Sequence, residues 1–284
     1  MTLDHGLIRV IVYDLDGTVY DDTRHFELYA REIQSHLPES VRDQFWADYT
    51  AAAHGRHPSL RIGTFYDVAR DLVLEIRGGR VARALHWDGS EIPPVVREQL
   101  YTGPLEPDHQ TLLNVGDLWW VPSAVSYHYG GLPEKHGEAF LRIRKIMSDP
   151  DFEVRPIPDL AEVIGSLRGK VVQVLATNSP QPDSEAILKK VGLMGLFDRM
   201  YFRSNKPAGL KPMLEEIARD YQVEMRQILS VGDNLVNEIT PVRALGCQTV
   251  FIDPHGVADP SEADLIVPAM SLFFPELERI AAGR

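Results

Sequence analysis

Residues 7–18 read LIRVIVYDLDGT, an apolar and β-branched run that stops at two aspartates, a glycine and a threonine. Such a run is typical of a strand that is buried on both faces, and the polar residues after it indicate a loop. Asp14 and Asp16 are so close in sequence that their like charges need a cation between them or a proton on one carboxyl. The stretch therefore predicts a reactive pair of carboxylates after a buried strand; an ordinary Asp-rich turn is the alternative.

The C-terminal half of the chain continues this pattern. Four further apolar runs predict strands, at residues 171–176, 199–203, 227–231 and 248–252. Stretches with helical apolar spacing separate these runs, which predicts an α/β fold with a doubly wound parallel sheet. Because parallel strands end at one edge of such a sheet, we expect Asp14, Thr177 and Asp233 to converge there.

Residues 21–155 do not follow the alternation of strand and helix. Several runs show helical spacing, among them Val68, Leu72 and Ile76, and residues 140–147. Residues 103–131 are rich in proline, glycine and aromatics and predict only loops and short helices. We therefore expect a core made of residues 1–20 and 156–284, and a mostly helical cap domain, residues 21–155, inserted after the first strand.

The polar residues at the predicted edge suit phosphoryl transfer. Asp14 would attack phosphorus, while Asp16 would protonate the leaving oxygen and later deprotonate water. Thr177 and Asn178 offer a hydroxyl and an amide for phosphoryl oxygens, although a helix cap is the commoner role of such residues. Lys211 could neutralise charge on Asp14 and on the transferring group.

The fourth strand end adds a candidate metal ligand. Asp233 is a fitting third ligand for Mg²⁺, which prefers a few carboxylates together with water and phosphate oxygen. Asn237 and Glu238 follow within about one helical turn and could orient metal-bound water.

Taken together, these residues resemble the four motifs of the haloacid dehalogenase-like (HAD) superfamily, in the family's order. The matching segments are residues 14–18, Thr177, Lys211 with Pro212, and residues 232–238. The resemblance spans about residues 7–20 and 156–253. It implies a Rossmann-like core, a phosphoryl-aspartate intermediate, Mg²⁺ held by Asp14, the backbone carbonyl of Asp16 and Asp233, and a mobile cap.

Three features depart from the family's pattern. Glu238 stands where the fourth motif usually ends in Asp, which puts its role beside the metal in doubt. Lys206 and Pro207 form a second candidate for the third motif; we favour Lys211 because Pro212 suits the first position of a helix. The inserted region is longer than the family's simple helical cap, so its substrate residues do not carry over.

The reading as a phosphatase has two alternatives. A dehalogenase of the same family displaces halide from carbon and needs no acid for the leaving group, so Asp16 argues against it. A non-catalytic binding protein would keep the fold without the reaction. A small phosphorylated metabolite is the expected substrate.

Composition limits the partners. The 29 basic and 41 acidic side chains give a net charge of −12, which disfavours nucleic acid and anionic membrane surfaces. Cys247 is the one cysteine, so no intrachain disulfide is possible and a reducing, cytoplasmic setting is expected. Neither a signal peptide nor a membrane span is expected.

Two groups in the insertion are candidates for substrate recognition. Aromatic residues could form a platform for a ring, but packing in the core of the cap is the favoured reading; they are Trp119, Trp120, Tyr127, His128 and Tyr129. Basic residues could meet a second anionic group, although a solvated helix end accounts for them better; they are His54, Arg56, His57 and Arg61.

Overall fold

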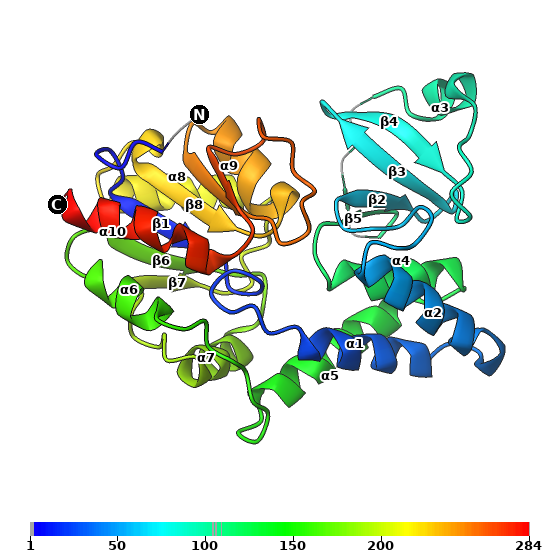
Figure 1. Ribbon diagram of the computed structural model, residues 1–284, viewed down its shortest axis with the longest axis horizontal. Coiled ribbons are helices and arrows are strands. Elements are labelled where there is room, and N and C mark those ends of the chain that lie inside the picture. The colour runs from blue at the N-terminus through cyan, green and yellow to red at the C-terminus, as the bar shows by residue number, and fades with distance from the viewer. Residues whose placement is uncertain (1–2, 104, 106, 109, 284) are drawn as a thin grey trace. The chain divides into compact units, whose positions relative to one another are not determined.

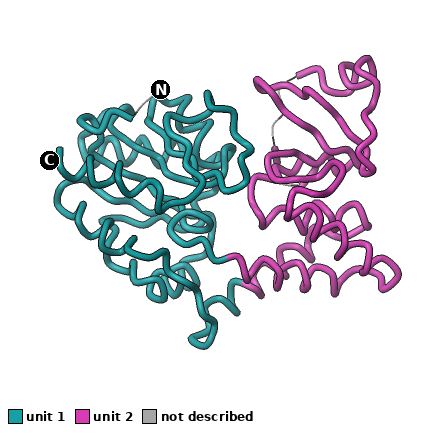
Figure 2. Tube along the Cα trace, in the orientation of Figure 1, with its two compact units in different colours: residues 1–22, 144–284 teal, residues 23–143 magenta. Residues whose placement is uncertain are grey.

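A computed structural model describes residues 3–103, 105, 107–108 and 110–283. The chain forms two compact units, one of residues 1–22 with 144–284 and the other of residues 23–143 (Figure 2). The sequence placed the borders at residues 20 and 155 instead. The second border differs because helix α5 (Pro133–Ser148) starts in one unit and ends in the other without a break.

A six-stranded parallel sheet forms the centre of the first unit, in the order β10-β9-β8-β1-β6-β7 (Figure 1). Its strands are β1 (Val10–Tyr13), β6 (Val172–Ala176), β7 (Arg199–Tyr201), β8 (Ile228–Gly232), β9 (Gln248–Ile252) and β10 (Leu265–Val267). All five predicted strands form, and the doubly wound α/β fold is confirmed. Strand β10, at the edge of the sheet, was not among the predicted strands.

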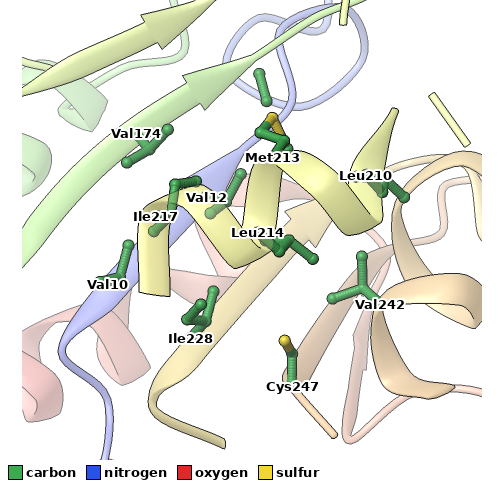
Figure 3. Close-up of a cluster of buried hydrophobic side chains, with 11 residues drawn as sticks. Val10, Val12, Val174, Leu210, Met213, Leu214, Ile217, Ile228, Val242 and Cys247 are labelled. Atoms are coloured by element: carbon green, nitrogen blue, oxygen red, sulfur yellow. The ribbon is translucent and has the colours of Figure 1, made fainter. Parts of the chain in front are cut away.

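Helices cover both faces of this sheet. They are α6 (Leu160–Ser166), α7 (Gln181–Lys190), α8 (Leu210–Asp220), α9 (Thr240–Ala244) and α10 (Phe274–Ala282). Figure 3 shows α8 packed on one face, where Leu214 and Ile217 meet Val10, Val12 and other buried side chains. On the opposite face, the Gln173 amide donates to the carbonyl of Ile164 in α6. Val174 and Gln173 point to opposite faces because side chains alternate along a strand.

Short helical turns connect these elements. They are the π-helix η3 (Leu235–Ile239) and the 3₁₀ helices η2 (Met225–Gln227) and η4 (Met270–Phe273), whereas the 3₁₀ helix η1 (Glu39–Val41) belongs to the inserted unit. Cys247 packs in the cluster of Figure 3, and burial raises the pKa of its thiol to about 12. Among the described residues, no helix is long and apolar enough to cross a bilayer.

The inserted unit combines helices with a four-stranded antiparallel sheet in the order β4-β3-β2-β5. The strands are β2 (Thr64–Asp67), β3 (Leu72–Arg77), β4 (Arg80–Leu85) and β5 (Leu112–Val115). The helices of the unit, besides the first part of α5, are α1 (Arg24–Ser35), α2 (Arg42–Ala53), α3 (Pro94–Leu100) and α4 (Trp120–His128). The expectation of a mostly helical cap therefore misses a sheet.

The helical prediction for Val68, Leu72 and Ile76 is wrong for a physical reason. Residues four apart share a face of a helix, but they also share a face of a strand, since four is a multiple of two. Gly78 and Gly79, both with positive φ, form the two-residue turn between β3 and β4. That Gly-Gly pair is a hairpin signal that outweighs the apolar spacing.

Candidate active site

The carboxyl ends of three neighbouring strands bring the predicted residues to one edge of the sheet. Strand β1 lies between β6 and β8, and Tyr13 is in register with Leu175 and Val231. The Asp14 amide donates to the Val231 carbonyl over 2.9 Å, so Asp14 lies level with the end of β8. The predicted convergence of Asp14 with the ends of β6 and β8 follows from this strand order.

Glycines allow two carboxylates to approach the backbone at this edge. Gly17 has a φ of +77°, and a Cβ added there would lie 2.0 Å from Oδ2 of Asp233. A Cβ on Gly232 would lie 2.7 Å from the Cβ of Glu238. The Asp233 carboxylate thus lies against the loop that carries Asp14 and Asp16, where any larger residue than Gly17 would displace it.

Lys206 is the lysine of the site. Its Nζ lies 2.6 Å from Oδ1 of Asp14 and 2.8 Å from Oε1 of Glu238, and it donates to the Ala176 carbonyl over 2.8 Å. Its side chain is only 2% exposed. Burial alone lowers the pKa of Lys206, but Asp14 and Glu238 raise it above its ordinary value. Lys206 is therefore a permanent positive charge between two buried carboxylates.

The prediction that Lys211 faces Asp14 is wrong. The Lys211 side chain is 67% exposed, and its Nζ lies 3.9 Å from Oε1 of Glu215, one turn further along α8. The buried face of α8 is formed by Leu210, Met213, Leu214 and Ile217. With that apolar stripe turned to the sheet, helix geometry turns Lys211 to solvent. Lys206 lies instead in the loop after β7, at the edge where functional residues gather.

Burial and two neighbouring charges of opposite sign act on the carboxylate of Asp14. Burial raises the pKa of Asp14; the nearby Lys206 opposes this shift, and Asp16 adds to it. The net direction is upward, so Lys206 alone does not fully offset the cost of an ionised Asp14. A further cation beside Asp14 would favour its ionised, nucleophilic form.

Both carboxylate oxygens of Asp16 accept hydrogen bonds. The Tyr20 hydroxyl and the Arg144 guanidinium donate to Oδ1, and the Ser179 hydroxyl donates to Oδ2 over 2.9 Å. The sequence analysis did not single out Tyr20, Ser179 or Arg144. Ser179 could have been found, since it stands in the same polar strand end as Thr177, but nothing in the sequence pattern signals Arg144.

Thr177 and Asn178 contact the chain itself. The Thr177 hydroxyl accepts from the Ser179 amide over 3.0 Å and is buried. The Asn178 side chain accepts from the Lys206 amide over 2.7 Å and donates to the Lys206 carbonyl over 3.1 Å. Asn178 therefore braces the loop that presents Lys206. That Thr177 and Asn178 bind phosphoryl oxygens stays a prediction.

Glu238 and Asn237, at the end of the fourth motif, differ in their contacts, although both were predicted to orient metal-bound water. Glu238 pairs with Lys206 and accepts from the Asn234 amide over 3.0 Å. Asn237 is buried, and its Oδ1 accepts no hydrogen bond from the described part of the chain. An orphaned buried acceptor of this kind suits a metal-bound water.

The donor set fits a hard divalent cation. Asp14 and Asp233 offer carboxylates, and the absence of a side chain at Gly17 leaves space for that of Asp233. No group of three His, Cys, Asp or Glu side chains suited to a metal occurs in the part of the chain that the structure describes. A site here therefore needs a backbone carbonyl such as that of Asp16, and oxygen-only ligation favours Mg²⁺ over zinc.

The aromatic segment of the insertion belongs largely to its own core. The Trp119 ring lies about 5 Å from each of four others, those of His25, Phe26, Tyr29 and Phe140. His128 stacks on Trp87, with ring centroids 4.0 Å apart, and its Nδ1 lies 2.8 Å from Asp71. These contacts favour the packing role over a platform for a substrate ring.

Two of the four basic candidates of the insertion, His57 and Arg61, already have partners within it. His57 is buried, and its Nδ1 accepts from the amides of Ser59 and Leu60, so the expected solvated helix end is wrong for this residue. Arg61 pairs with Glu75 over 2.8 Å. His54 lies exposed at the end of α2, as expected. Arg56 is exposed too.

Comparison with known proteins agrees with this geometry. Residues 8–246 match the family model of haloacid dehalogenase-like hydrolases. The HAD-hydrolase YfnB from Bacillus subtilis, solved bound to magnesium, is 13% identical with a TM-score of 0.54, over 95% of this chain and 98% of that one. A HAD phosphatase from Thermococcus onnurineus is 15% identical with a TM-score of 0.47, over 98% and 99%. No curated protein matches the chain.

Proposed function

Because this chain belongs to the haloacid dehalogenase-like hydrolase family, we propose that it hydrolyses a small phosphate monoester through a phosphoryl-aspartate on Asp14. One observation carries the proposal. A buried nucleophile candidate, Asp14, is paired with Lys206, while a second carboxylate two residues later is held by hydroxyl and guanidinium donors. Environments that differ in this way suit two carboxylates with different tasks.

In the first step the Asp14 carboxylate attacks phosphorus and forms an acyl-phosphate bond. The bond between phosphorus and the ester oxygen breaks, and Asp16 gives a proton to the departing oxygen. In the second step water attacks phosphorus and gives its proton to Asp16. The acyl-phosphate bond breaks, inorganic phosphate leaves, and Asp14 and Asp16 return to their starting states.

The contacts of Asp16 favour Oδ2 as the oxygen that carries the proton. Oδ1 faces the guanidinium of Arg144, which has no acceptor, so a proton there would meet a donor. Oδ2 faces the hydroxyl of Ser179, which can turn to accept as well as donate. Ser179 thus permits both protonation states that the two steps require.

Lys206 would stabilise negative charge as the transferring group passes through its transition state. It lies beside Asp14, is buried and is always charged, so its field is weakly screened. The Thr177 hydroxyl, at the end of β6, would contact a phosphoryl oxygen.

The proposal includes Mg²⁺ held by Asp14, Asp233 and the Asp16 carbonyl, with Asn237 as an acceptor for bound water. When bound, it would neutralise charge on Asp14 and on the phosphoryl oxygens. Burial raises the pKa of Asp14, and a bound cation would oppose that shift and favour the ionised carboxylate.

The net charge of −12 favours a small substrate over a polyanion. A phosphorylated metabolite carries few charges, which the buried Lys206 together with a bound cation could compensate locally. A nucleic acid or an anionic membrane would meet the acidic surface over a larger area.

The test compares phosphate and halide release. Purified protein should hydrolyse 4-nitrophenyl phosphate with Mg²⁺ and stop when EDTA removes the metal, and Asp14→Asn should be inactive while it still folds and unfolds cooperatively. Release of chloride from 2-chloropropionate instead of phosphate would support the dehalogenase alternative. Activity toward neither would favour a non-catalytic binding protein.

A further inference from the structure

Arg144 is a buried charge that takes no part of its own in the two proposed chemical steps. Its side chain is 1% exposed, and it lies in the last part of α5, one residue past the border between the two units. Its guanidinium donates from Nε to Asp183 and from Nη1 to Asp16, and its Nη2 lies 3.5 Å from the hydroxyl of Ser184. All of these partners belong to the same unit as Arg144.

The two carboxylates have different roles in this arrangement. Asp183, in the first turn of α7, is buried and would neutralise Arg144 by itself. Burial lowers the pKa of Arg144, but Asp16, Tyr20 and Asp183 raise it above its ordinary value, so the charge is permanent. One carboxylate balances the charge of Arg144, yet the charge of Asp16 is the largest single cause that raises its pKa, so the contact with Asp16 points to a further task for this ion pair.

The guanidinium is suited to fix a carboxylate in place. The donors of the guanidinium lie in one rigid plane. When Asp183 holds Nε, the direction in which Nη1 donates is therefore fixed as well. Tyr20 donates to the same Asp16 oxygen, Oδ1. With Oδ1 held by two donors, rotation of the carboxylate is restricted and Oδ2 keeps its place beside Ser179.

We propose that Arg144 is the positioning residue of Asp16: anchored on Asp183, it holds the carboxylate in the orientation from which Oδ2 exchanges a proton with the leaving group. This inference rests on the proposed function, since it assigns Arg144 to the proton transfer of that reaction. A purely structural ion pair would affect folding but would not distinguish one leaving group from another.

Leaving groups of different acidity test this assignment. A dinitrophenolate leaves without a proton, whereas an unsubstituted phenolate depends on the acid. We therefore expect Arg144→Met to lower kcat/KM, which reports the step in which the leaving group departs, at least tenfold more for phenyl phosphate than for 2,4-dinitrophenyl phosphate, a fraction of the roughly 10²–10⁴-fold usual for an acid. Asp16→Asn should show the same preference more strongly. Arg142→Met is the matched control, since Arg142 lies on the same helix and is 67% exposed.

Arg144→Lys is a second variant that tests the proposal even if Arg144→Met fails to fold. Lysine retains the buried charge for Asp183, but its ammonium has no rigid planar fork and so does not fix the direction of a contact with Asp16 as Nη1 does. It should therefore keep a melting temperature near that of the wild type and still show the selective loss on phenyl phosphate.

Each outcome separates the two proposals. An equal loss of kcat/KM for both esters in Arg144→Lys, or a higher kcat/KM for phenyl phosphate, would overturn the positioning role and leave the phosphatase intact. A wild type that hydrolyses neither ester would remove the proposed function, and the role of Arg144 with it.

Discussion

The two units of the molecule differ in how their strands are buried. In the six-stranded sheet, β1, β6, β8 and β9 are covered on both faces and read as nearly continuous apolar runs. In the insertion, β4 carries two arginines among its six residues, and only its last two residues are buried. A strand that is buried on both faces is therefore easy to recognise from its sequence, whereas a strand of a half-exposed antiparallel sheet is not.

The first way to sharpen this comparison uses two lysines of the core unit. Lys206→Met should abolish turnover and lower the free energy of unfolding by about 3–5 kcal/mol, because it leaves Asp14 and Glu238 buried without their cation. Lys211→Met should change stability by less than about 0.5 kcal/mol and keep activity, since its side chain is exposed. Urea unfolding and activity assays of both variants test this difference. Equal losses of activity and stability in the two variants would contradict the assignment of Lys206 to the site.

The second prediction separates the two aspartates of the edge. Asp16→Asn should slow hydrolysis of phenyl phosphate by roughly 10²–10⁴-fold, the usual contribution of a general acid and base. It should leave Mg²⁺ affinity nearly unchanged, because only the backbone carbonyl of Asp16 is proposed as a ligand. Asp233→Asn, measured beside it by calorimetric titration with Mg²⁺, should lose metal binding. Equal loss of affinity in both would contradict this division of roles.

The third prediction concerns the aromatic core of the insertion. Trp119→Ala should destabilise the protein by about 2–4 kcal/mol, because it opens a cavity among four aromatic rings. Hydrolysis of 4-nitrophenyl phosphate should persist below the lowered melting temperature. His128→Ala, at the stacked and partly exposed contact with Trp87, is the matched comparison and should cost less. If Trp119→Ala kept full stability but changed substrate preference, the packing role would be wrong.

The smallest effect expected is a pH dependence within the insertion. Burial lowers the pKa of His136 to about 4, below its ordinary value of 6.5. A lowered pKa means that the unfolded state binds the proton more tightly than the folded state. The contribution of neutral His136 to the free energy of unfolding is therefore fully present above pH 6.5 and is lost as the pH falls toward 4. We expect this contribution to be roughly 1–3 kcal/mol.

His136→Gln isolates that contribution. A glutamine amide can keep the contact with the Ser126 hydroxyl, which lies 3.0 Å from Nε2 of His136, but it does not titrate. Unfolding free energies at pH 4.5 and 7 should therefore differ less in the variant than in the wild type. Identical slopes in the two proteins would show that His136 is not the group responsible.

Much of the core could be predicted because local pattern and function coincide there. The residues after β1, β6 and β8 are polar at the places where buried strands end, and strand order then brings them together. Lys206 was misjudged because Pro212 was given more importance than the apolar stripe of α8, which already turns Lys211 outward. Weighing Leu210, Leu214 and Ile217 first would have identified Lys206.

Other parts could not be predicted, for reasons of distance along the chain. Arg144 reaches Asp16 across 128 residues of sequence, and no periodic pattern marks such a contact. The hairpin of β3 and β4 was open to prediction from Gly78 and Gly79, but the pairing of β2 with β5 spans a long intervening segment. Tertiary contacts of this kind are decided by packing that local propensity does not record.

The most direct test of the central claim is to locate the phosphoryl group during turnover. The wild-type protein is mixed with substrate and Mg²⁺, quenched in acid within the first turnover, digested and mapped by mass spectrometry. The account predicts a phosphorylated peptide that contains residues 10–18, with the group on Asp14, and none in Asp14→Asn. A phosphoryl group on any other side chain, or steady hydrolysis by Asp14→Asn, would contradict it.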